Sequence, residues 1–148
     1  MFYKKYSAEL WIVFAVGVNL SVAFSVQNFP YADIVNHLAR YTLIHDLWFS
    51  GTSSEYVDIR PLPTAYIAVD IVGATLLHWF APQTVMHAIA ALCLITLPLG
   101  TYLFARVVAP QQRGLAAVAA LLSFNWYFLY GFVNYILGVG FALMVLSV

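Results

Sequence analysis

Residues 85–108, with the sequence VMHAIAALCLITLPLGTYLFARVV, decide the fold class of this chain. The stretch is mostly apolar and contains one formally charged residue, Arg106, near its end. A helix needs about 20 consecutive apolar residues to cross the hydrocarbon core of a bilayer, and this stretch is long enough. Pro98 and Gly100 lie within it and predict a kink. The stretch therefore predicts a membrane-spanning helix.

The composition of the whole chain leads to the same fold class. Hydrophobic residues make up 64% of the sequence and charged residues 8%, whereas a soluble domain carries about 25% charged residues. So few charges cannot cover the surface of a folded soluble domain, and we expect lipid to cover much of it. The formal net charge is zero, so the chain offers no basic stripe to nucleic acid phosphates.

Further apolar stretches lie on both sides of residues 85–108. Those long and apolar enough for membrane helices are residues 10–26, 114–130 and 134–148. The last of them stops within an apolar run, so we expect the chain to be the N-terminal part of a longer protein. The sequence thus predicts an all-α, polytopic helical membrane protein with four or five membrane helices in a single domain, residues 1–148.

The orientation of the chain follows from its first residues. Lys4 and Lys5 precede the apolar stretch 10–26, and the positive-inside rule places such an N-terminus in the cytoplasm. The stretch is longer than the core of a secretory signal peptide, and no clear cleavage site follows it. We therefore expect an uncleaved transmembrane anchor, which makes residues 27–63 an extracytoplasmic loop.

The topology of residues 64–80 stays open at this stage. This segment is short, and it contains Asp70 and His78. If it crosses the membrane, the loop that holds Arg106 and Arg113 lies outside, which the positive-inside rule disfavours. If it is instead a short juxtamembrane helix, the same loop lies in the cytoplasm. The two arginines favour the second arrangement.

The extracytoplasmic loop contains the densest polar cluster of the chain, on an amphipathic helix expected at residues 31–49. Asp33, His37 and Arg40 recur at i, i+4 and i+7, so they share one helix face. Asp33 and His37 are one turn apart and can share a hydrogen bond, and Arg40 can bind an anion such as a lipid phosphate. A carboxylate so placed can act as a general base. The alternative is a solvated helix face on which Asp33 favours the first turn.

A metal site is a weaker interpretation of the same residues. The i, i+4 spacing of Asp33 and His37 suits two ligands of one ion. Two ligands do not make a site, and the chain contains no metal-binding motif. We therefore assign no metal ligand, and the dependence on a divalent metal stays open.

Three further residues are candidates for a site. Asp70 lies among apolar neighbours, where a charge costs about 2.5–3.5 kcal/mol on insertion scales; it is either functional or a packing acid paired with an arginine such as Arg60. His87 flanks the turn at Pro82, and it either lies at the headgroup level or belongs to a site. Asn134 either caps a helix or binds a substrate hydroxyl.

The layout of these segments resembles the N-terminal module of the GT-C class of membrane glycosyltransferases. An anchor leads to a long extracytoplasmic loop with an early acid on a juxtamembrane helix, and a Pro-started helix and several spans follow. The segments DIVNHLAR (residues 33–40), RPLPT (60–64) and GFVNYILG (131–138) also resemble a group of uncharacterised bacterial membrane proteins with this organisation. The resemblance covers nearly the whole chain as a layout.

The resemblance implies an activity and a location. The GT-C class transfers sugars from polyprenyl-phosphate-linked donors on the extracytoplasmic side, which implies the inner membrane of a bacterium. Asp33 corresponds to the first-loop acid that serves as catalytic base or metal-binding acid, although Ile34 stands where many members carry a second acid. The substrate-binding candidates are His37, Arg40, Asp70, His87 and Asn134.

The rival interpretation is a non-catalytic membrane protein, such as a scaffold or a transporter module. A transport site lies near the midplane of the bilayer. In that case Asp70, within an apolar helix, would matter more than Asp33.

Overall fold

The structure, a computed structural model, describes residues 6–27, 32–51 and 67–148. These residues form helices and connecting turns, and no strand occurs among them. The prediction of an all-α fold is therefore confirmed for this part of the chain. Lys4, Lys5 and the loop residue Arg60 lie outside the described residues.

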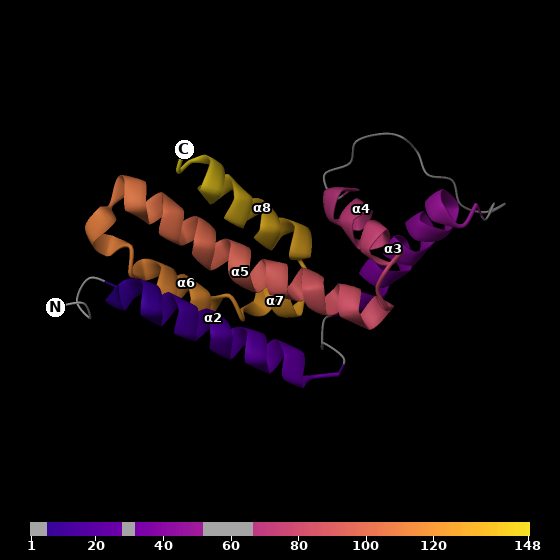
Figure 1. The fold of residues 1–148 in the computed structure, drawn as a ribbon, viewed down its shortest axis with the longest axis horizontal. Helices are drawn as coiled ribbons and strands as arrows, with labels where there is room; N and C mark the ends of the chain where they lie inside the picture. Colours follow the sequence, from indigo (N-terminus) through magenta and orange to yellow (C-terminus); the bar gives the residue numbers. More distant parts are fainter. Residues whose placement is uncertain (1–5, 28–31, 52–66) are drawn as a thin grey trace.

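The two longest helices run side by side in opposite directions (Figure 1). They are α2 (Ser7–Ser25) and α5 (Pro82–Val108), with 19 and 27 residues. Both are long and apolar enough, by length and composition alone, to cross a membrane, whereas the other apolar helices of the described part are shorter. With a rise of about 1.5 Å per residue, α5 is about 40 Å long.

The ends of α5 follow from its sequence. Ala81 has an extended backbone, and Pro82 occupies the first turn, where a fixed φ and a missing N–H are compatible with a helix. The helix continues through Pro98 and ends at Val108. Pro110 then opens the short 3-10 helix η1 (Pro110–Gln112), because proline cannot donate a hydrogen bond to continue the preceding α-helix.

After η1 the chain returns past α2 as α6 (Leu115–Leu122) and α7 (Trp126–Leu129), and then turns back as α8 (Val133–Val145) (Figure 1). Asn125 divides the apolar stretch 114–130 into two helices. Its side-chain oxygen accepts a hydrogen bond from the backbone N–H of Phe128 at 3.0 Å, which caps α7.

Helices α5 and α8 approach each other most closely through glycines. A Cβ atom on Gly100 would collide with the carbonyl oxygen of Gly140, and one on Gly140 would lie 2.8 Å from the carbonyl carbon of Thr96. Gly138 and Ala142, two further small residues of α8, lie away from this contact: a Cβ on Gly138 would have nothing within 4 Å, and Ala142 is exposed.

Helices α3 (Ile34–Phe49) and α4 (Ile67–Leu76) pack against each other at one end of the bundle, here called the α3–α4 end (Figure 1). Tyr41 of α3 is fully buried there. Its ring lies directly against Gly73 of α4, where a Cβ would be 2.5 Å from the ring carbon Cδ2. The ten described residues of α4 span about 15 Å.

The start of α2 and the α5–α6 loop meet at the opposite end of the bundle, here called the Glu9 end. The hydroxyl of Tyr102 donates a hydrogen bond to Glu9 at 2.9 Å, and Nε of Arg113 lies 3.4 Å from the same carboxylate. Helix α8 also ends toward this side (Figure 1). The loop that holds Arg113 therefore lies beside the beginning of α2.

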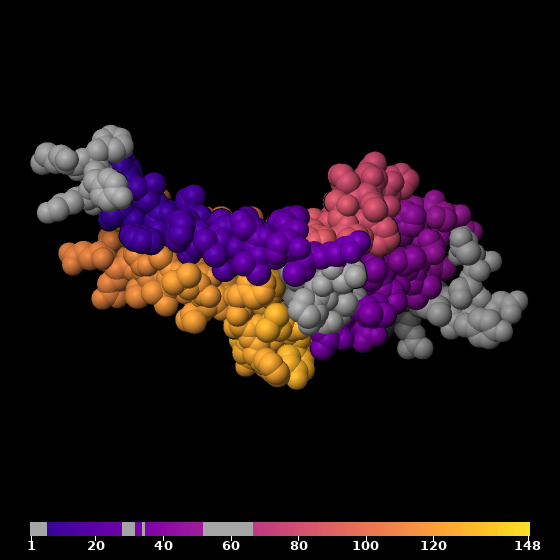
Figure 2. Space-filling view, turned by 90° about the horizontal axis from the view of Figure 1, so that it is seen from below, coloured from indigo at the N-terminus to yellow at the C-terminus, as the bar shows by residue number. Residues whose placement is uncertain are grey.

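The outer face of α2 is apolar and exposed. Figure 2 shows α2, in indigo, lying along the outside of the bundle beside α6. Its exposed side chains include Trp11, Val13, Phe14, Val18 and Val22. A contiguous exposed apolar surface of this kind marks contact with a protein partner or with a membrane.

Candidate functional site

An ion pair between Arg40 and Asp70 connects α3 to α4. Nε of Arg40 donates to Oδ2 of Asp70 at 3.0 Å, and Nη2 donates to Oδ1 at 3.2 Å. The Asp70 side chain is 9% exposed, whereas that of Arg40 is 43% exposed. These two N–H···O bonds compensate for the solvation that the carboxylate of Asp70 loses on burial. The partner of Asp70 is therefore an arginine on the neighbouring helix.

The same guanidinium fixes the ring of His37, which is itself buried. Nη2 of Arg40 lies 2.8 Å from Nδ1 of His37. An arginine can only donate, so Nδ1 accepts, and the ring carries its proton on Nε2. That nitrogen lies 2.8 Å from the carbonyl oxygen of Gly131, to which it donates. His37 therefore connects Arg40 to the turn between α7 and α8.

The side chain of Asp33 lies beside the hydrogen-bond network of Arg40, Asp70 and His37 but makes no hydrogen bond to these residues. Its Oδ2 lies 3.6 Å from Nε2 of His37, so the expected hydrogen bond between these side chains is not formed. The proton on Nε2 is directed to Gly131 instead. Oδ1 of Asp33 accepts a hydrogen bond from the side-chain amide of Asn36. Asp33 occupies the N-cap position of α3 but makes no side-chain capping bond, and its side chain is 43% exposed.

Gly131 brings the start of α3 against the α7–α8 turn. Its φ of +83° lies in the left-handed region, which glycine adopts without the steric penalty of a side chain. A Cβ at this position would lie 3.2 Å from Cβ of Asp33. The backbone N–H of Ala32 also donates to the carbonyl oxygen of Leu129 at 3.2 Å. Glycine is thus required here both for the turn and for the close approach.

These residues surround a cleft of about 380 Å³ where α3 meets the α7–α8 turn, here called the Asp33 cleft. Its walls combine a carboxylate, a guanidinium, an imidazole and an amide with three aromatic rings. The lining residues are Asp33, His37, Arg40, Tyr127, Gly131, Phe132, Val133, Asn134 and Tyr135. The cleft can therefore present both charged groups and ring faces to one ligand.

Asn134 lines the Asp33 cleft and does not cap α8. The N-cap residue of α8 is Phe132, and no side chain makes a capping hydrogen bond there. Of the two roles indicated by the sequence, the capping role of Asn134 is wrong. The residue that caps a helix in this region is Asn125, at the start of α7.

The aromatic wall of the cleft was not among the residues singled out from the sequence. The ring of Tyr127 lies 5.9 Å from that of Phe132 and 5.5 Å from that of Tyr135, measured between centroids. All three side chains are exposed. The density of aromatic residues between positions 126 and 135 was the available signal, but only the fold shows that they face Asp33.

His87 lies in a different pocket. That pocket, of about 430 Å³, is lined by the end of α2 and the start of α5. The ring nitrogens of His87 lie 2.8 Å from the carbonyl oxygen of Gln83 and 3.1 Å from that of Val26, and the ring stacks on Phe24. The structure therefore does not bring His87 to the Asp33 cleft.

Tyr41 lies behind the ion pair. Its hydroxyl is buried and has no hydrogen-bond partner among the described residues. Burial, together with the nearby negative charge of Asp70, raises the pKa of Tyr41 above its usual value. The ring of Tyr41 has no exposed surface, and its hydroxyl is protonated. Behind Arg40, the contact between α3 and α4 is therefore mainly apolar.

The described residues contain no group of three or more histidine, cysteine or acidic side chains that could hold a metal ion. Comparisons of the chain with family models, with curated proteins and with solved structures found no match.

Proposed function

We propose that this chain is a membrane-embedded module of a GT-C-like glycosyltransferase, and that the Asp33 cleft binds a polyprenyl-phosphate-linked sugar at the extracytoplasmic surface of a bacterial inner membrane. Two features support the membrane location. Helices α2 and α5 have the length and composition of membrane spans. The exposed apolar face of α2 matches what lipid contact requires.

The positions of the loops support the proposed orientation. Arg113 lies beside Glu9 at the start of α2, so the loop after α5 shares a side with the start of α2, which Lys4 and Lys5 precede in the sequence. A cytoplasmic location of this side agrees with the positive-inside rule. The described residues of α4 span about 15 Å, half of a bilayer core of about 30 Å. In this arrangement α2, α5, α6–α7 and α8 make four crossings, with α3 and α4 at the outer surface.

The observation that carries the proposal is the composition of the Asp33 cleft. An exposed carboxylate, the guanidinium of Arg40 and the side chain of Asn134 share one cavity with the rings of Tyr127 and Tyr135. Aromatic rings offer flat apolar surfaces, and the polar groups offer hydrogen bonds to sugar hydroxyls or a phosphate. This mixture suits an amphipathic, anionic sugar donor better than it suits a purely apolar ligand.

The proposed reaction is inverting transfer of the sugar. A hydroxyl or amine of the acceptor attacks the anomeric carbon of the donor while the bond from that carbon to the phosphate oxygen breaks. Asp33 takes the proton of the acceptor as general base, and polyprenyl phosphate leaves with the electron pair of the broken bond. Arg40 stabilises the charge of the leaving phosphate. Its Nε and Nη2 are held by Asp70 and His37, while no described residue accepts a hydrogen bond from Nη1.

The position of Asp70 weighs against the transporter alternative. That alternative needs a functional acid near the middle of the spanning helices. Asp70 instead lies on α4, at the α3–α4 end of the bundle (Figure 1), and its carboxylate is engaged by Arg40.

The test is sugar transfer by the full-length protein in liposomes with a polyprenyl-phosphate-linked donor. Asp33→Asn keeps the size and the hydrogen bonding of the side chain but cannot accept a proton. We expect the rate to fall about 100- to 10,000-fold, the usual contribution of general-base catalysis.

The matched control is Asp46→Asn. Asp46 also lies on α3, where it contacts His45 at 3.2 Å outside the Asp33 cleft, and this change should leave the rate unchanged. A near-normal rate with Asp33→Asn would remove Asp33 from the mechanism and favour a scaffold.

A further inference from the structure

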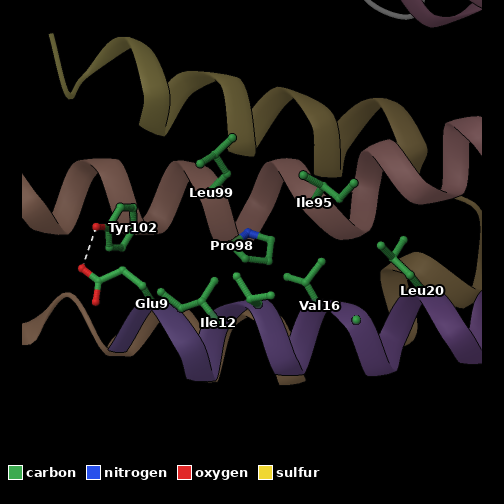
Figure 3. Close-up of a pocket in the computed structure, with 10 residues that line it drawn as sticks. Glu9, Ile12, Val16, Leu20, Ile95, Pro98, Leu99 and Tyr102 are labelled. Atoms are coloured by element: carbon green, nitrogen blue, oxygen red, sulfur yellow. Dashed lines mark hydrogen bonds between the residues drawn. The ribbon is translucent and has the colours of Figure 1, made fainter. Parts of the chain in front are cut away.

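A second cavity, distinct from the Asp33 cleft, lies between the two longest helices. This groove has a volume of about 470 Å³ and runs between α2 and α5 (Figure 3). Its lining residues are Glu9, Ile12, Val13, Val16, Gly17, Leu20, Ile95, Pro98, Leu99 and Tyr102. Polar side chains occur only at its Glu9 end, where Tyr102 donates a hydrogen bond to Glu9.

We propose that this groove binds one acyl chain of an anionic phospholipid from the cytoplasmic leaflet, with the phosphate of the headgroup held by Arg106. The inference rests on the membrane orientation given under the proposed function. It does not depend on sugar transfer.

The length of the groove matches a single leaflet. Along α2 it extends from Glu9 to Leu20, which is about 17 Å at a rise of 1.5 Å per residue. Half of a hydrocarbon core of about 30 Å is about 15 Å. Because the groove follows the axes of two helices that cross the membrane, it also runs along the direction of the acyl chains. One extended chain can therefore occupy it.

The charges at the Glu9 end are complementary to an anionic headgroup. Two arginines, Arg106 and Arg113, lie near one carboxylate, Glu9, and Arg113 forms the ion pair with it. Arg106 is exposed, makes no ion pair with any described residue, and stands 5.6 Å from the ring centroid of Tyr102. Arg106 thus lies one helical turn beyond the end of the groove. The headgroup phosphate of a lipid whose acyl chain occupies the groove would lie at this level.

Gly17 lines the groove and leaves space beside it: a Cβ at this position would meet nothing within 4 Å. A larger side chain at this position can fill the groove without displacing its neighbours, which provides a direct way to block it.

The test uses the full-length protein in phosphatidylcholine vesicles containing phosphatidylglycerol with a photoreactive diazirine on its acyl chain. After irradiation, adducts are mapped by peptide mass spectrometry. We expect adducts on the groove side of α2 and α5, and a several-fold loss of them in Gly17→Leu. In Arg106→Gln we expect the preference for phosphatidylglycerol over phosphatidylcholine to fall about fivefold, since one arginine near the surface is removed.

The matched control is Gly138→Leu on α8. A Cβ on Gly138 also has open space around it, but this residue is not in the groove, so groove adducts should be unchanged. Adducts that persist in Gly17→Leu, or that spread evenly over exposed residues such as Trp11 and Phe14, would overturn the proposal. So would the absence of groove adducts, which would show that another helix or a second copy covers the site. Labelling needs no sugar donor, so a failed transfer assay leaves this result standing.

Discussion

At the scale of single residues, Arg40 organises the site. It neutralises Asp70 through two hydrogen bonds and donates a further hydrogen bond to Nδ1 of His37. The ring of His37 therefore carries its proton on Nε2, which donates to the carbonyl oxygen of Gly131. Asp33 stays outside this network, held by Asn36. Within the described part of the chain, the carboxylate of Asp33 is therefore not paired with an arginine, which suits its proposed role as general base.

The first prediction at this scale concerns the Arg40–Asp70 pair. Asp70→Asn leaves the guanidinium without its carboxylate, and we expect a loss of about 1–3 kcal/mol, because Arg40 is partly exposed and solvent compensates part of the loss. Arg40→Gln should cost a similar amount. The free energy of unfolding of both variants, and of the double variant, is measured in detergent by urea titration.

A double-mutant cycle then isolates the pair. If the two residues act together, the double variant should lose clearly less than the sum of the two single losses. Additive losses would show that the ion pair does not couple α3 to α4.

At the scale of elements, the contact of α3 with α4 depends on the absence of a side chain at Gly73. The Tyr41 ring is fully buried and lies directly over this residue. Since Asp70 is only three positions away on α4, the packing at Gly73 also sets the position of the acid relative to Arg40.

The corresponding prediction is that Gly73→Ala separates the two helices. The added methyl group would overlap the Tyr41 ring, and overpacking of this kind costs about 1–3 kcal/mol. We expect a lower free energy of unfolding, partly restored when Tyr41→Leu is added. Gly17→Ala is the control, because its Cβ meets open space and alanine favours a helix interior. An unchanged stability of Gly73→Ala would show that α3 and α4 are not packed as described.

The helical elements and the polar face of α3 could be predicted from the sequence because both depend on local periodicity. Asp33, His37 and Arg40 were placed on one face by their spacing, and all three line the cleft. The pairing of Asp70 with Arg40 joins residues 30 positions apart and depends on the packing of α3 against α4, which the local spacing of the sequence does not indicate. The role of Gly131 depends on a contact with His37 across 94 positions of the chain, which no local pattern encodes.

At the scale of the whole molecule, the two ends of the bundle differ in chemistry. The Glu9 end holds Glu9, Arg113 and the exposed Arg106, and it is where the proposed lipid headgroup would bind. The α3–α4 end holds the ion pair, and the Asp33 cleft opens where α3 meets the α7–α8 turn. The proposed function therefore requires that the two ends face opposite sides of a membrane.

This orientation is tested by the labelling of two single-cysteine substitutions in intact cells with a membrane-impermeant thiol reagent. Thr42→Cys lies on the exposed surface of α3, and Gln111→Cys lies on the exposed η1 turn. The only native cysteine, Cys93, is buried, and the unsubstituted protein provides the background. We expect Thr42→Cys to react in intact cells and Gln111→Cys to react only after lysis. Equal labelling of both positions in intact cells, or the reverse pattern, would contradict the account.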